Sequence, residues 1–239
     1  MESRLFGRRA MIRLASVLGV TSICVLLSGC ALEQARRDYL VLNNKLPHSH
    51  MGNNRGDVYS RGGMPITLPS KIIDEIVKKS EEGDALAMSQ LGQLYLLGQG
   101  VEKNVEEGVR LTLASAEKGW VSAQHNIAWL YENGTGLEQS WEKAIYWYEQ
   151  AAQQKKASSL NNLGRIYDNG FGVEEDKIRA FEYYLLAADR LSPLGQHNVG
   201  LSFLEGVQGE KNREKAKLYF ESACLQKFRP SCDALKGLE

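Results

Sequence analysis

Serine and lysine side chains occur in patterns that could support covalent catalysis. Ser-x-x-Lys strings begin at Ser115 and Ser140, with the spacing found around the nucleophile of some serine acyl enzymes. Ser159 and Asn161 match a second short element of those enzymes, but no Lys-Thr-Gly or Lys-Ser-Gly follows. Because such an enzyme needs all three elements together with an oxyanion hole, we take an envelope serine hydrolase only as the alternative function.

Histidines are the other candidates for chemistry, as metal ligands. His48 and His50 have no third soft ligand nearby, so they indicate adventitious binding at most. His125 and His197 are 72 residues apart, two periods of the repeat described next. They would lie roughly 15 to 20 Å apart if each repeat adds a helix-packing distance of about 8 to 10 Å. The sequence therefore predicts no metal site and no cofactor.

An interval of 36 residues organises the chain. It relates Gly98, Gly134, Gly170 and Gly206, and also the apolar positions Leu91, Ile127, Leu163 and Val199. A period in the mid-thirties is typical of a helical solenoid. Four units fit without insertions, at residues 84–119, 120–155, 156–191 and 192–227.

Two helices joined by a glycine-containing loop are predicted in each unit. In the first helix, Ala87, Leu91 and Leu94 have the spacing of a buried stripe. The recurring glycines are placed to end this helix in the left-handed conformation. Favoured N-cap residues six positions later open the second helix: Asn104, Ser140, Asp176 and Asn212. A half-repeat helix from Lys71 to Glu82 precedes the array, so the predicted fold is all-α over residues 70–239, with helical caps at both ends.

Residues 1–29 have the pattern of a secretory signal. Four arginines precede an apolar run from Leu14 to Leu27, which is shorter than the roughly 20 residues that span a bilayer. A retained transmembrane anchor is the alternative. The run closes in Leu-Ser-Gly-Cys, which resembles the lipobox of bacterial lipoproteins and implies acylation of Cys30. Ala31 stands where an aspartate would resemble an inner-membrane retention signal, so the resemblance implies an outer-membrane lipoprotein that faces the periplasm. Residues 30–69 have no sustained period and are expected to form a flexible tether.

Charge and cysteine content narrow the function classes further. Without residues 1–29, which hold four arginines and Glu2, the 29 basic and 29 acidic residues become 25 and 28, a net charge of about −3. This balance does not favour binding to nucleic acid. The mature chain keeps Cys224 and Cys232 beside the acylated Cys30, and two cysteines in an oxidising compartment should pair. Two buried free thiols are the alternative.

The recurring residues resemble the Sel1-like repeat, a relative of the tetratricopeptide repeat. The second and third units carry the pattern most fully, at Ile127 to Tyr131 and Leu163 to Tyr167 with the glycine loops that follow. The resemblance implies a right-handed α/α solenoid whose first helices line the concave surface. It also implies that the Cys224–Cys232 pair clamps helices, here pinning a short cap at residues 228–239. Some cysteine-rich members are associated with penicillin binding and β-lactam hydrolysis, hence the hydrolase alternative.

Positions that differ between units fall at i, i+3, i+7 and i+10 of the first helix and form one face, here called the variable face. Its members are Leu86, Ser89, Gln93 and Leu96; Ser122, His125, Trp129 and Glu132; Ser158, Asn161, Arg165 and Asp168; and Leu194, His197, Leu201 and Leu204. A concave face is the usual binding surface of a solenoid. The predicted partner-binding residues are His125, Trp129, Glu132, Asn161, Arg165, Asp168, His197, Leu201 and Leu204. An exposed Trp129 beside Arg165 has the composition of an interface hot spot; alternatively, Trp129 packs between adjacent repeats.

These observations predict a non-enzymatic, lipid-anchored periplasmic scaffold or adaptor that binds another protein, an envelope component or a secreted toxin. We expect it to contact the membrane only through Cys30 and to bind no nucleic acid. The resemblance adds a narrower expectation, because lipid-anchored proteins with such repeats include immunity proteins that neutralise phospholipase effectors of type VI secretion.

Overall fold

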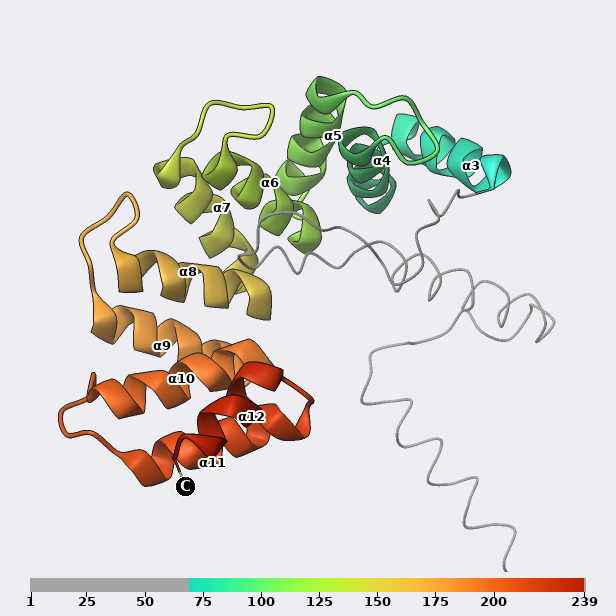
Figure 1. Ribbon diagram of the computed structural model, residues 1–239. Helices are drawn as coiled ribbons and strands as arrows, with labels where there is room; N and C mark the ends of the chain where they lie inside the picture. The colour runs from blue at the N-terminus through green and yellow to red at the C-terminus, as the bar shows by residue number, and fades with distance from the viewer. Residues whose placement is uncertain (1–68, 239) are drawn as a thin grey trace, which may run out of the picture. The chain divides into compact units, whose positions relative to one another are not determined.

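The computed structural model describes residues 69–238, and every regular element within that range is an α-helix (Figure 1). The expected signal segment 1–29, the acylation of Cys30 and the tether up to residue 68 lie outside the described residues. The helices are α3 (Ser70–Glu81), α4 (Ala85–Leu97), α5 (Val105–Glu117), α6 (Val121–Asn133), α7 (Trp141–Gln153), α8 (Ala157–Asn169), α9 (Lys177–Ala188), α10 (Pro193–Glu205), α11 (Arg213–Leu225) and α12 (Arg229–Lys236). None of the described helices is long and apolar enough to cross a bilayer.

Helices stack in the order of the chain. Nearly all contacts join a helix to the one before or after it, and Figure 1 shows the stack running from α3 in teal to α12 in dark red. The pairs α4/α5, α6/α7, α8/α9 and α10/α11 are the four predicted repeats. At the ends, α3 corresponds to the second helix of a repeat and α12 to the first. The predicted α-solenoid of four two-helix repeats with helical caps is confirmed.

Local capping chemistry sets the bounds of these helices. The side chains of Asn104, Ser140, Asp176 and Asn212 each accept a hydrogen bond from the backbone N–H three residues later. The first helices end at Gly98, Gly134, Gly170 and Gly206, with φ of 68°, 64°, 66° and 80°. A side chain is disfavoured in this left-handed conformation, which explains the recurrence of glycine there.

Small residues let the two helices of a repeat approach closely. Ala144, Ala180 and Ala216 are buried, and the rings of Tyr148 and Phe220 are fully enclosed. A Cβ atom at Gly164 would overlap the ring of Tyr184, so that contact requires glycine. The buried clusters extend from one repeat into the next, and the core is therefore a continuous strip along the stack.

A disulfide bond between Cys224 of α11 and Cys232 of α12 fixes the C-terminal end of the stack. The two Cα atoms are 4.9 Å apart, within the normal range for a disulfide. The predicted pairing is confirmed.

The loop of the fourth repeat departs from the others as its sequence indicates: the second left-handed glycine is Gly209, one position later than in the other repeats.

Candidate functional site

Not all of the variable face is at the surface. The side chains at its second position turn into the junctions between repeats: Ser89 and His125 are 4% exposed, Asn161 is 5% exposed, and His197 is half-buried. This corrects the expectation that His125 and Asn161 offer their side chains to a partner. The i, i+3, i+7, i+10 spacing placed these residues on one side of each helix, but the next repeat covers that part of it.

Polar pairs across the junctions explain why this position differs between repeats. His125 Nδ1 lies 2.9 Å from Ser159 Oγ, and His197 Nδ1 lies 2.9 Å from Ser231 Oγ. Asn161 Nδ2 donates to Ser192 Oγ at 2.8 Å. Each pair joins one repeat to the next, and a buried polar group must be matched by a partner. The variation at this position therefore reflects pairing between neighbouring repeats, although Asn161 Oδ1 is buried without a hydrogen-bond partner within the described residues.

Burial keeps the junction histidines neutral. The apolar surroundings of His125 lower its pKa to about 3, and the nearby ammonium group of Lys156 adds to the shift. Burial also lowers the pKa of His197. Neither residue is available as a surface acid or base.

Trp129 is half-buried and packs against two core clusters. One cluster contains Ile127 and Leu130, and the other contains Leu163 and Ile166 of the next repeat. The indole thus fills the space between adjacent repeats, which was the alternative to an exposed binding residue. Only part of its surface remains for a partner.

A charged network occupies the centre of the variable face. Arg165 Nη2 lies 2.6 Å from Glu132 Oε1, and Tyr148 Oη donates to Glu132 Oε2 at 2.9 Å. The Arg165 and Glu132 side chains are 25% and 13% exposed. Burial, reinforced by the adjacent Glu132 carboxylate, raises the pKa of Tyr148 well above its ordinary value. Both oxygens of Glu132 are engaged by the fold, and the network ties α6 to α7 and α8.

Asp168 and the leucines of α10 remain more available. Asp168 is half-buried and receives one long hydrogen bond, 3.5 Å, from Tyr184 Oη. Burial raises the pKa of Asp168, which Lys177 opposes and Glu205 reinforces. Leu194 and Leu201 are 40% and 39% exposed, large fractions for leucine, and Leu204 is half-buried. Of the predicted contact residues, Asp168, Leu201 and Leu204 are the best candidates for contact with a partner.

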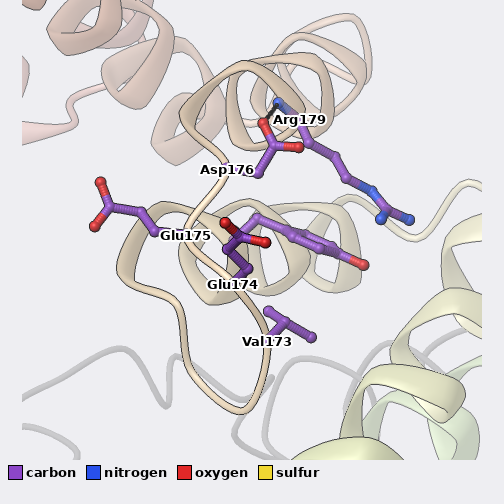
Figure 2. Close-up of a pocket in the computed structure, with 6 residues that line it drawn as sticks. Val173, Glu174, Glu175, Asp176 and Arg179 are labelled. Carbon is purple, nitrogen blue, oxygen red and sulfur yellow. Dashed lines mark hydrogen bonds between the residues drawn. The ribbon is translucent and has the colours of Figure 1, made fainter.

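A shallow hollow of about 490 Å³ lies beside the loop between α8 and α9, lined by Tyr167, Val173, Glu174, Glu175, Asp176 and Arg179 (Figure 2). Two of its polar side chains, Asp176 and Arg179, already have partners in the fold. Asp176 caps α9 by accepting a hydrogen bond from the Arg179 backbone N–H at 2.9 Å. The Arg179 guanidinium lies 4.1 Å from the centre of the Tyr167 ring. We therefore give this hollow no functional role.

Both serines of the Ser-x-x-Lys strings serve the fold. Ser115 is fully buried and donates to the Ala85 carbonyl at 2.5 Å, which ties α5 to α4. Ser140 caps α7 by accepting from the Lys143 backbone N–H at 3.3 Å. The Ser115 hydroxyl is therefore inaccessible to a substrate, and the Ser140 hydroxyl has a structural role at the start of α7. Within residues 69–238, no group of three or more His, Cys, Asp or Glu side chains could hold a metal ion.

The repeats match a known family. The family model of the Sel1 repeat matches residues 85–120, 121–156, 157–190 and 193–228, more than half of the chain. The chain belongs to the Sel1 repeat family. The matched segments begin one residue after the units proposed from the sequence and follow the same four α-helical pairs. Sel1 repeats mediate interactions between proteins.

Solved Sel1 repeat structures support the fold. A Sel1 repeat protein from Oxalobacter formigenes is 26% identical, with a TM-score of 0.65 over 69% of this chain and 67% of that one. The c5321 protein, a protective antigen of uropathogenic Escherichia coli with an SLR fold, is 29% identical, with a TM-score of 0.66. That match covers 68% of this chain but only 35% of c5321. No curated protein sequence matches significantly.

A more distant match, the immunity protein Pa5087 of Pseudomonas aeruginosa, is 21% identical, with a TM-score of 0.47 over 71% of this chain and 63% of that one. A likeness this weak says nothing of function. The choice of partner must therefore be argued from the residues of this chain.

Sequence reasoning missed Tyr148, which binds Glu132, and the junction serines Ser192 and Ser231, and it considered Ser159 only as part of a catalytic element. A signal for two of them was present. Ser159 and Ser231 each follow a histidine by 34 residues, and the two histidines are 72 residues apart. A search for pairs that recur at twice the repeat length would have found both contacts.

Proposed function

We propose that this Sel1 repeat protein is a lipid-anchored periplasmic adaptor that binds another protein through the part of the variable face that stays exposed. One observation supports this most: within a face whose centre is occupied by internal pairs, α10 presents Leu194 and Leu201 at about 40% exposure. Apolar side chains beside charged ones are typical of protein interfaces. The exposed end of the face thus combines an apolar strip with the carboxylate of Asp168.

Membrane attachment in this proposal rests on the sequence. Leu-Ser-Gly-Cys closes the apolar run at Cys30, and more than one acyl chain on that cysteine would anchor the protein stably. Mass spectrometry of the N-terminal peptide from the membrane fraction should show Cys30 as the first residue, carrying acyl chains. An N-terminal peptide whose Cys30 is unmodified would contradict acylation as the anchor.

A narrower role within this function is immunity against a delivered toxin such as a phospholipase effector. This idea rests on the combination of a lipobox-like sequence with Sel1 repeats. Its competitor is an adaptor for an endogenous envelope complex. The two roles predict different partners for the same surface, and both can therefore be tested by identifying what the variable face touches.

Site-specific photo-cross-linking tests the proposal. A photoreactive amino acid replaces Leu201 in the full-length protein, and a matched control replaces Tyr146, which is 52% exposed on α7 and outside the variable face. We expect an adduct of one defined mass from position 201 and none of that mass from position 146. Mass spectrometry of the adduct distinguishes a toxin from an envelope component. Adducts that form equally at both positions, or only at 146, would place binding elsewhere.

A further inference from the structure

An ion pair that joins the second and third repeats, here called the template, has no counterpart between the third and fourth repeats. Glu132 at the end of α6 is bound by Arg165, a residue of the next repeat 33 positions later. Moving this pair by one repeat gives Asp168 at the end of α8 and Leu201 on α10. The carboxylate is kept in the third repeat, but the arginine that should meet it from the fourth repeat is replaced by leucine.

Other features of the two sites correspond closely. Tyr148 donates to Glu132, and Tyr184, 36 residues later, donates to Asp168 at the same separation of 16 residues. The hydrogen bond lengthens from 2.9 Å at Glu132 to 3.5 Å at Asp168. In the first and fourth repeats the acid is replaced by Leu96 and Leu204, which need no cation. Asp168 therefore keeps the hydrogen bond from a tyrosine that Glu132 has, but it lacks the arginine that pairs with Glu132.

Local cations do not fill this position. Among residues 69–238, no lysine, arginine or histidine side chain forms an ion pair with Asp168 within 4.0 Å. Lys177, the cation that acts on Asp168 from nearby, instead contacts Glu205 Oε2 at 3.4 Å on the exposed surface. Where the arginine of the template would approach, Leu201 presents 39% of its surface.

We propose that Asp168 and Leu201 form a subsite for one arginine side chain of the bound protein, with the guanidinium on the Asp168 carboxylate and the aliphatic stem on Leu201 and Leu204. This inference rests on the proposed function and specifies the partner's chemistry. Arginine fits better than lysine because its planar fork pairs with a carboxylate through two hydrogen bonds and its stem packs on apolar side chains. In the template, Arg165 Nη2 donates one hydrogen bond to Glu132 Oε1 while Tyr148 binds the other oxygen, and Tyr184 likewise binds Asp168 Oδ2.

Binding of a minimal probe tests the subsite without knowledge of the partner. N-acetyl-arginine amide is titrated into the full-length protein while backbone amide shifts are followed by NMR, with N-acetyl-citrulline amide as the uncharged control. We expect saturable shifts, in the millimolar range typical of a single side chain, at α8 and α10 with the arginine probe only. The absence of such shifts, or equal shifts with citrulline, would overturn the proposal.

Two variants sharpen this test. Asp168→Asn should reduce affinity for the arginine probe at least about tenfold, whereas Asp189→Asn, at an exposed acid after α9, should leave it unchanged. Leu201→Arg should also abolish probe binding, because the new side chain would pair with Asp168 within the chain. In that variant the Asp168 pKa, read from its side-chain carboxyl shift, should fall. A Leu201→Arg protein that still binds the probe would contradict the proposed geometry.

The arginine subsite and the proposed function can fail independently, and the two experiments distinguish these failures. If position 201 gives a cross-linked adduct but Asp168→Asn leaves its yield unchanged, the face binds a protein and the arginine subsite is wrong. If the probe binds and depends on Asp168 but no adduct forms at position 201, the subsite holds and the adaptor proposal fails. When both hold, the cross-linked peptide of the partner should contain an arginine close to the adduct.

Discussion

His197 Nδ1 lies 2.9 Å from Ser231 Oγ, the same distance that separates His125 Nδ1 from Ser159 Oγ 72 residues earlier. Two further contacts follow this interval: Gln154 Nε2 donates to Gln124 Oε1, and Gln226 Nε2 donates to Gln196 Oε1, both at 2.8 Å. The hydrogen-bonding pattern thus repeats every two units, although the helices repeat every unit. Through Ser231, α12 takes the place that the first helix of a further repeat would hold.

Acid should destabilise the protein through His125. Its pKa of about 3 in the folded state lies below the ordinary 6.5, so the unfolded chain binds a proton first. Stability from this group is complete above pH 6.5 and falls as the pH decreases toward 3, by about 2 kcal/mol between pH 7 and pH 5. Urea denaturation at these two pH values measures the loss.

His125→Asn is the matched control for this titration, because Asn161 holds the same position one repeat later. The variant should lose most of the difference between pH 7 and pH 5 and keep only the smaller share from His197, whose pKa is also lowered by burial. A variant with the full pH dependence of the wild type would show that the histidine is not responsible.

Leu191→Gly should stabilise the protein by about 0.5 to 1 kcal/mol. Leu191 has φ of 58° and is 71% exposed, so it bears the strain of a left-handed conformation with little packing in return. Glycine occupies the equivalent turn at Gly119, with φ of 85°. Thermal denaturation checks the gain. The reverse change, Gly119→Leu, should lower stability by about 1 to 2 kcal/mol, and a neutral result for both changes would show that the turns relax without cost.

The Glu132–Arg165 pair should show strong coupling in a double-mutant cycle. Removing Arg165 alone leaves the nearly buried Glu132 carboxylate without its cation. The two single changes to leucine should therefore together lower the free energy of unfolding more than the double change does. We expect a coupling energy of about 1 to 3 kcal/mol from urea denaturation. The exposed pair of Glu107 and Arg110 is the control and should give about 0.5 kcal/mol or less. Equal coupling in the two pairs would mean that burial adds nothing.

Reducing the Cys224–Cys232 disulfide should loosen α12 before it unfolds the rest. The chain-entropy model gives about 2.5 kcal/mol for a loop of this size. Freed from α12, His197 would lose Ser231 and part of its burial, and its pKa should rise toward 6.5. Proton NMR of the His197 ring in the presence and absence of a reductant measures this shift, and the His125 resonance is the internal control. An unchanged His197 after reduction would show that packing alone holds α12.

The helices, their caps and the disulfide were predictable because they depend on residues close together in the sequence. Asn104 opens α5 and Gly98 ends α4 for local reasons, which the 36-residue recurrence displays four times. The candidate site was less predictable. Whether His125 faces solvent or Ser159 depends on how one repeat leans on the next, and helical spacing within a single repeat carries no such information.

Comparing equivalent positions in the four repeats identifies the Asp168 subsite only when the contacts between repeats are known. In the sequence, Asp168 and Leu201 are two unrelated differences between repeats. The contact between Glu132 and Arg165 shows that the residue 33 positions after the acid approaches it, and only then does the leucine stand out.

Because each helix touches mainly its neighbours, an end helix separates from the stack at the loss of one interface, whereas an interior helix must lose two. The Cys224–Cys232 bond closes the C-terminal end, whereas within residues 69–238 no disulfide ties α3 to α4, against which it packs. An unfoldase or a protease that captures the partly opened chain would therefore gain entry at α3 and advance toward α12. The order of peptides released in limited proteolysis would record that direction.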